Sequence, residues 1–125
     1  MFPYKVSPRV ATITGGTRKY YATALKQGGI EGDALVALLS QRTRLAEADT
    51  LKLLLYLSEL VAERMLEGST VTLPNLGILR PTLSSRGVAR PSDFRTKDIT
   101  RVNVNFLPNR KLKARLQLAH FRRVD

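Results

Sequence analysis

The sequence predicts an α+β fold, in which two helices precede three strands and a last helix, and three observations support this. Residues 45–68 form a long stretch with apolar residues at helical spacing, preceded by a shorter stretch of the same kind. After Gly68, apolar and polar residues alternate, as they do in strands. Pro108-Asn109 then opens a short basic stretch that again has helical spacing. Elements that do not alternate between helix and strand along the chain are typical of α+β domains.

The first helix is predicted from Asp33 to about Arg42, and the second from about Ala46 to Gly68. Asp33 can accept hydrogen bonds from the free amides of the first turn. Ala46 is a poor N-cap, which costs about 1 kcal/mol relative to Ser or Thr. Gly68 can end the second helix in the left-handed conformation. The link between the helices is short, so we expect an antiparallel hairpin.

The second helix is apolar on nearly every side, and this predicts a homodimer. A surface helix hides one face, whereas a helix this apolar needs cover all round. One chain of 125 residues supplies little cover, and a second copy would supply the rest. The residues predicted to lie at the dimer interface are Leu51, Leu54, Leu55, Val61 and Phe106.

Three strands are predicted after Gly68, at residues 71–73, 78–84 and 101–105, with a turn at residues 74–77. Pro81 requires a sheet edge or a bulge in the second strand. In the third strand we expect Val102, Val104 and Phe106 to face the core. Residues 84–100, between the last two strands, are polar and basic. They predict a protrusion with its tip near residues 88–91.

Residues 1–29 differ from the rest and are predicted to be an N-terminal extension, with residues 30–125 as the main domain. Residues 2–6 and 19–25 have the composition of extended segments, which suggests a two-stranded addition with a long loop. Gly15-Gly16-Thr17 lies in that loop but lacks the spacing of a phosphate-binding loop. Tyr20-Tyr21 could stack on bases, although packing within a strand is the expected role.

The net charge of +11 is distributed unevenly along the chain. Residues 1–79 hold nine Lys/Arg and seven Asp/Glu, whereas residues 80–125 hold twelve Lys/Arg and three Asp/Glu. This asymmetry predicts a polyanionic partner for the C-terminal part. The four cations of residues 110–115 could hold phosphates near a helix start or form a solvated helix face, and both readings stay open.

Other function classes find little support in the sequence. There is no Cys for a disulfide or a thiolate site. Residues 1–10 lack the apolar core of a secretory signal, and no apolar run could span a bilayer, so a cytoplasmic protein is expected. His120, the sole histidine, is expected on the surface, and Asp93 and Asp98 are expected in ion pairs. We therefore expect no enzyme activity, cofactor, metal, membrane partner or small-molecule substrate.

The order of elements and three local motifs resemble the HU/IHF family of bacterial histone-like DNA-binding proteins, over about residues 31–118. Residues 33–68 are similar to the family's helical hairpin. Asn75-Leu76-Gly77-Ile78-Leu79 corresponds to its G-F-G-x-F turn and strand, and residues 106–112 to its F-x-P-G-x-x-L entry to the last helix. The extension with Lys19-Tyr20-Tyr21 looks like an HU-related branch.

The resemblance implies an intertwined dimer whose two β-arms reach around DNA in the minor groove. In the family, a Pro at each arm tip wedges between base steps, and Pro91 is placed for that role. The chain departs from the pattern in three places. Ala89-Arg90-Pro91 replaces R-N-P on a shorter arm, while Asn75 and Asn109 replace glycines.

The sequence thus predicts a nucleoid-associated, architectural protein that binds duplex DNA with little sequence preference. The residues predicted to contact DNA are Arg80, Arg86, Arg90, Pro91, Arg95, Lys97, Arg101, Arg110, Lys111 and Lys113. The alternatives are an HU scaffold that binds another protein, and an RNA-binding protein, because a basic arm does not by itself distinguish DNA from RNA.

Overall fold

The structure is a computed structural model that describes residues 1–10 and 16–125. It divides into two compact units. The terminal unit comprises residues 1–31 and 115–125, and the central unit comprises residues 32–114. The predicted division lies at residues 29 and 30, whereas the structure also groups the last residues of the sequence with the extension. Within the described residues, no helix has the length and apolar character to cross a membrane.

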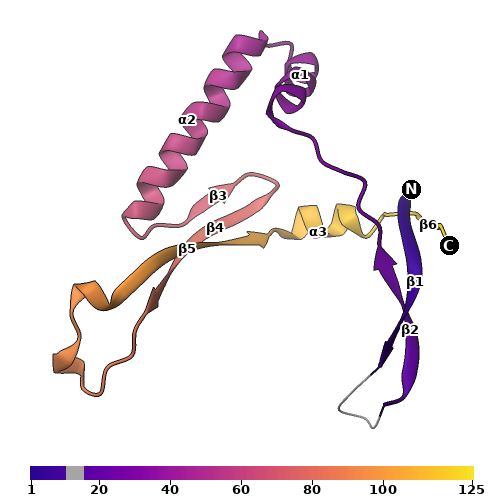
Figure 1. Cartoon of the computed structure of the whole chain (residues 1–125). Helices are drawn as coiled ribbons and strands as arrows, with labels where there is room; N and C mark the ends of the chain where they lie inside the picture. The colour runs from indigo at the N-terminus through magenta and orange to yellow at the C-terminus, as the bar shows by residue number, and fades with distance from the viewer. Residues whose placement is uncertain (11–15) are drawn as a thin grey trace. The chain divides into compact units, whose positions relative to one another are not determined.

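The central unit begins with the predicted helical hairpin, α1 (Gly32–Thr43) and α2 (Glu47–Leu66) (Figure 1). Ala46 makes no side-chain capping hydrogen bond, as predicted, and its carbonyl accepts the Thr50 amide at 3.0 Å. Gly68 has a φ of 82°, and its amide donates to the Met65 carbonyl at 3.0 Å. The left-handed glycine that the sequence predicts therefore ends α2.

The central sheet is antiparallel and has the order β3-β4-β5, with β3 at Val71–Leu73, β4 at Gly77–Ser85 and β5 at Ile99–Pro108. The short β3 pairs only with residues 77–79 of β4. Pro81 lies beyond this pairing and is opposite Val104 of β5, so one side of the strand is open there. A proline without an N–H is tolerated at such an edge. The register shifts between Ser84 and Ser85, where the arm begins.

Much of the apolar surface of the central unit is uncovered in the single chain. Val36 is buried, but Leu51, Val104 and Phe106 are 47%, 60% and 47% exposed. The expectation that Val102, Val104 and Phe106 face a core is therefore not met within one chain. They share a sheet face with Leu79 and Leu83, as the register requires. This face and α2 line an apolar hollow of about 540 Å³.

The terminal unit contains a second, mixed sheet with the order β2-β1-β6. Strands β1 (Phe2–Val10) and β2 (Arg18–Ala24) form the predicted antiparallel pair, while the predicted loop glycine, Gly15, lies outside the described residues. Strand β6 (Phe121–Arg123) runs parallel to β1 and was not predicted. The sequence predicts a three-stranded antiparallel sheet and a two-stranded addition, whereas the addition is a three-stranded mixed sheet. A strand of three residues is too short to show the alternation of apolar and polar residues that identifies strands. The strand that pairs with it, β1, lies at the other end of the sequence.

The Asp125 carboxylate connects the β6 segment to β1. Its two oxygens accept the Val6 amide at 2.9 Å and the Arg123 Nε at 2.6 Å. The Arg123 hydrogen bond, followed by the Val6 amide, holds the pKa of Asp125 below its ordinary value. The same contact raises the pKa of Arg123. The backbone adds hydrogen bonds from Phe2 N to His120 O and from Val124 N to Tyr4 O.

Replacing Gly77 by Ala should destabilise the central unit strongly. A Cβ at this position would overlap the Leu107 carbonyl oxygen and lie 2.8 Å from the Phe106 ring. We expect a loss of about 3 kcal/mol in the free energy of unfolding, measured in urea, because overpacking forces the backbone to shift. Gly87→Ala is the control, since a Cβ there meets nothing within 4 Å. Equal stabilities for the two variants would contradict the close approach.

Replacing Asp125 by Asn should loosen β6 without unfolding the central unit. The Val6 amide should exchange with solvent faster in the variant, measured by NMR, while the Leu79 amide of β4 should not change. In the parent, the carboxylate contributes fully above its ordinary pKa of about 3.9. Because its folded pKa is lower, the contribution is lost only as the pH falls through that lower value. A Val6 amide shift that does not respond to acid would contradict this role.

Candidate nucleic-acid interface

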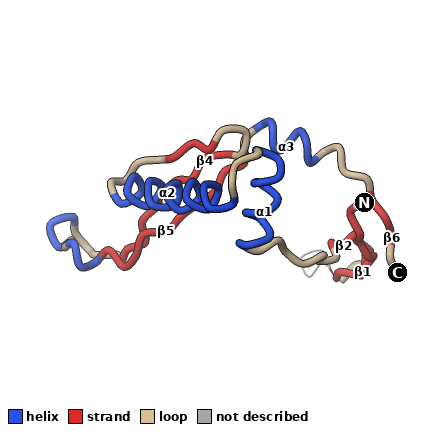
Figure 2. The backbone as a smooth tube through the Cα atoms, turned by 90° about the horizontal axis from the view of Figure 1, so that it is seen from above, coloured by secondary structure: helices blue, strands red, loops and turns tan. Residues whose placement is uncertain are grey.

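Strands β4 and β5 carry a protrusion between them, which we call the arm (residues 86–98). It extends beyond the paired strands and contains two short 3-10 turns, η2 (Pro91–Asp93) and η3 (Thr96–Asp98) (Figure 1; Figure 2). The amide of Arg86 donates to the Asp98 carbonyl at 2.8 Å and closes the base of the arm. The predicted protrusion is therefore present, with Pro91 exposed as the first residue of η2.

The charged residues of the arm tip are partly used to hold its shape. Arg95 donates from Nη1 to the carbonyls of Ser92 and Phe94, at 2.9 and 3.2 Å. The Asp98 carboxylate accepts the Arg95 amide at 2.9 Å, so this acid caps a turn. It does not form the expected ion pair with any residue that the structure describes. Asp93 does form one, at 3.4 Å from Arg90 Nε. Both partners are well exposed, so the pair adds little stability.

The remaining cations of the arm region face solvent. Arg86 and Lys97 are exposed and form no ion pair within the described part of the chain. Arg80 and Arg101 lie on the polar face of the β4–β5 pair, opposite Asn105 and Ser84 respectively. In this region, the cations with freedom to bind an external anion thus lie on the arm and along this ribbon.

The basic residues of α3 (Arg110–Leu116) form a separate group. Asn109 Oδ1 accepts the Leu112 amide at 2.8 Å, so the residue that replaces the family's glycine caps the helix. Arg110, Lys111 and Lys113 are exposed. They follow the end of β5, whereas the arm precedes its start, and ten strand residues span roughly 30 Å. One chain therefore does not bring the ten predicted contact residues into a single patch.

Sequence reasoning missed a second set of exposed cations, in the terminal unit. Arg9 and Arg18 lie over the rings of Tyr21 and Tyr20, with Cζ 5.4 and 5.7 Å from the ring centroids. The rings are 44% and 64% exposed, so the expected packing of these tyrosines within a strand does not bury them. The interleaving of Lys/Arg with Tyr in residues 18–21 is the signal that could have found them. Across the described residues, no cluster of acids and histidines is suited to a metal ion.

A helical hairpin with a strand ribbon that ends in a basic arm defines the class of HU-like domains. The chain belongs to the HU-HIG family, described as an HU domain fused to a wHTH, Ig or glycine-rich motif, whose model matches residues 2–123. This confirms the resemblance drawn from the motifs and extends it to the terminal unit.

A solved structure supports the same fold. It is a Bacteroides vulgatus ATCC 8482 protein, provisionally described as a bacterial DNA-binding protein, with a TM-score of 0.67 and 12% sequence identity. The match covers 98% of this chain and 48% of that one, so this chain spans about half the length of its neighbour. A comparison with curated proteins gave no match.

Proposed function

We propose that the protein binds duplex DNA as a homodimer, without enzymatic activity, and that the arm makes the principal contacts. The observation that carries this proposal is a protruding arm with exposed cations on an HU-type scaffold. Binding of this kind would support compaction or bending of a bacterial chromosome in the nucleoid. The DNA-binding description of the structural neighbour supports the same partner.

The electrostatics of the arm favour phosphate contacts over base reading. Arg86 and Lys97 form no ion pair within the described residues, and the weak exposed pair of Arg90 can exchange its carboxylate for a phosphate. The arm offers no recognition helix of the kind that reads base edges in the major groove. Phosphate contacts position a protein without reporting sequence, so we propose low sequence preference. Pro91 is the residue placed to wedge between base steps.

The uncovered apolar surface supports the homodimer. Leu54 and Val61 line the apolar hollow together with Leu79 of the sheet. Leu51 and Leu55 are 47% and 56% exposed in one chain. Contiguous apolar surface of this kind marks an interaction site. A second copy presents the same surface, and obligate dimer interfaces resemble a core cut in half. Two arms would then act on one duplex.

The parent should sediment at about twice the chain mass of 14.0 kDa at micromolar concentration. Leu54→Asp should abolish folding, detected by circular dichroism, because obligate dimers often have no stable monomer. Tyr56→Asp, on the polar side of the same helix and already 60% exposed, is the matched control and should stay folded and dimeric. A folded parent monomer would contradict the homodimer.

Removing the free arm cations should flatten the salt dependence of DNA binding. Six phosphate contacts, three from each arm, give a slope of log affinity against log salt of about −5 on duplex DNA. The arm variant Arg86→Ala/Arg90→Ala/Lys97→Ala should bind more weakly with a shallower slope, measured by fluorescence anisotropy. Arg95 is left in place because it holds the tip.

Pro91→Ala tests whether Pro91 inserts between base steps: the variant should change the bend angle of the DNA while binding with similar affinity.

The control for net charge is the helix variant Arg42→Ala/Lys52→Ala/Arg64→Ala, which loses the same charge outside the arm. It should keep most of the affinity and the slope. If the arm variant binds duplex DNA like the parent, the arm is not the DNA-binding site. The α3 cations would then be the candidate site, or the protein would bind another protein as in the alternative hypothesis. Equal binding to duplex RNA would favour the RNA alternative.

A further inference from the structure

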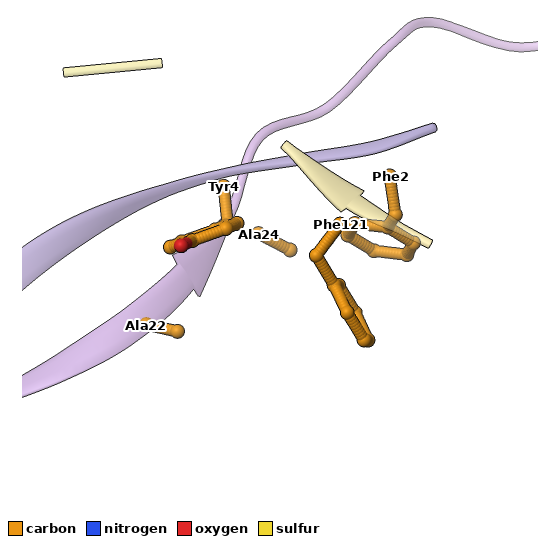
Figure 3. A pocket seen from close by; sticks show the side chains of 5 residues that line it. All are labelled: Phe2, Tyr4, Ala22, Ala24 and Phe121. Atoms are coloured by element: carbon orange, nitrogen blue, oxygen red, sulfur yellow. The ribbon is translucent and has the colours of Figure 1, made fainter. Parts of the chain in front are cut away.

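The two faces of the mixed sheet of the terminal unit differ: one carries an apolar cluster together with Arg18 and Arg123, and the other carries four cations. Side chains alternate along a strand, and the register sets which of them share a face. Tyr4 pairs with Ala24 and Phe2 pairs with Phe121, so these residues lie on one face. They line a hollow of about 380 Å³ that is largely apolar (Figure 3). Phe121 packs against Phe2 and Tyr4 there, with ring centroids 6.1 and 6.5 Å away.

The opposite face, which we call the basic face, carries four cations and one aromatic ring. Three successive cross-strand pairs lie on it, namely Lys5 with Thr23, Ser7 with Tyr21 and Arg9 with Lys19. The parallel pairing of β6 places Arg122, opposite Pro3, on the same face. The basic face thus consists of Lys5, Arg9, Lys19, Tyr21 and Arg122, all of them exposed.

The charges of the basic face are not compensated within the terminal unit. Arg9 lies directly opposite Lys19, and like charges in this position destabilise a strand pair. The unit holds eight Lys/Arg and two Asp/Glu, a net of +6 in 42 residues. Of the two acids, Asp125 is bound by Arg123. This count of acids includes residues 11–15, which contain none. An external anion would relieve this repulsion.

Tyr21 adds a second kind of recognition to the charge. Its ring is 44% exposed and lies between the row of Arg9 and Lys19 and the row of Lys5. Successive rows on one face are roughly 7 Å apart, similar to successive phosphates of an extended strand. A flat aromatic surface bordered by cations is the combination that binds single strands, by base stacking and phosphate pairing together.

We propose that the basic face is a second nucleic-acid-binding surface, which takes single-stranded nucleic acid. Tyr21 stacks on an unpaired base as Arg9 moves from its position over the ring to a phosphate. Lys19 and Lys5 bind neighbouring phosphates, and Arg122, two residue rows from Tyr21, binds one further along the strand. A duplex would meet the cations but would leave the ring without a partner, because its bases are stacked on one another. The surface lies in a different unit from the arm and does not depend on the arm's role.

The test is binding of the full chain to fluorescein-labelled (dT)20 and to a 20-base-pair duplex, by fluorescence anisotropy. Tyr21→Val keeps a strand-forming residue and removes the ring, and it should weaken (dT)20 binding about tenfold. Tyr21→Phe should bind like the parent. Tyr20→Val is the matched control, because Tyr20 lies on the opposite face, is 64% exposed and also has an arginine over its ring. This variant should bind (dT)20 like the parent.

The cations are tested by the variant Arg9→Ala/Lys19→Ala. Its salt slope on (dT)20 should be shallower by about 1.4, since each phosphate contact on a single strand contributes about 0.7. Its fold should be retained, because it removes a repulsive pair. Arg18→Ala/Lys26→Ala, which loses the same charge elsewhere in the unit, should change the slope little. The arm variant should keep its (dT)20 affinity while losing duplex affinity.

Three results would overturn the proposal. Equal losses with Tyr21→Val and Tyr20→Val would show that neither ring is a specific platform. Loss of (dT)20 binding in the arm variant would place the single-strand site on the arm and leave the proposed duplex function intact. Weaker duplex binding but unchanged (dT)20 binding in Arg9→Ala/Lys19→Ala would make the basic face a duplex surface.

Discussion

The pairing of β4 with β5 is the constraint on which the central unit depends. One register runs from Gly77 opposite Pro108 to Ser84 opposite Arg101. Because side chains alternate with a period of two, a slip of one residue would exchange the apolar and polar faces of the whole ribbon. Gly77 helps to fix this register, since it alone leaves room for the Leu107 carbonyl and the Phe106 ring. The same pairing carries the arm and presents Arg80 and Arg101 on one face.

The cations of the arm divide into those that build it and those that are free to bind. Arg95 is committed to the carbonyls of the tip. Arg86 and Lys97 form no ion pair within the described residues, and the exposed pair of Arg90 is weak enough to exchange for a phosphate. Truncating a structural arginine would change the shape of the arm as well as its charge. The charge of a basic segment is therefore a poor measure of how many phosphates it can neutralise.

The terminal unit changes the meaning of the charge distribution. Counted along the sequence, the excess of positive charge lies after residue 79. Counted by structural unit, the terminal unit has +6 in 42 residues and the central unit +5 in 83. The difference arises mainly because six of the seven acids before residue 80 lie in the central unit, which leaves residues 1–31 with five Lys/Arg and one acid. Residues 115–125 add three arginines and one acid to the terminal unit. The terminal unit, which contains the predicted extension, thus has the higher net positive charge per residue.

The sequence by itself determined the elements whose signals are local. The periods of α1 and α2, the left-handed Gly68, the alternation in β4 and β5 and the two-stranded pairing of residues 2–24 could all be read from neighbouring residues. So could the basic protrusion and the family. Such features depend on backbone geometry and side-chain period over a few residues, and the structure reproduces them.

Only the tertiary structure decided which distant residues meet. Strand β6 is three residues long, and its pairing with β1 depends on contacts such as Val6 N to Asp125 that no local pattern records. The folded backbone also decides that Arg95 holds the arm tip while Arg86 stays exposed. It likewise separates α3 from the arm. The register of β1 and β2 determines that Arg9 lies opposite Lys19, with Tyr21 in the next row of the same face. Register is set by the summed pairing of whole strands, and for that reason single residues do not reveal it.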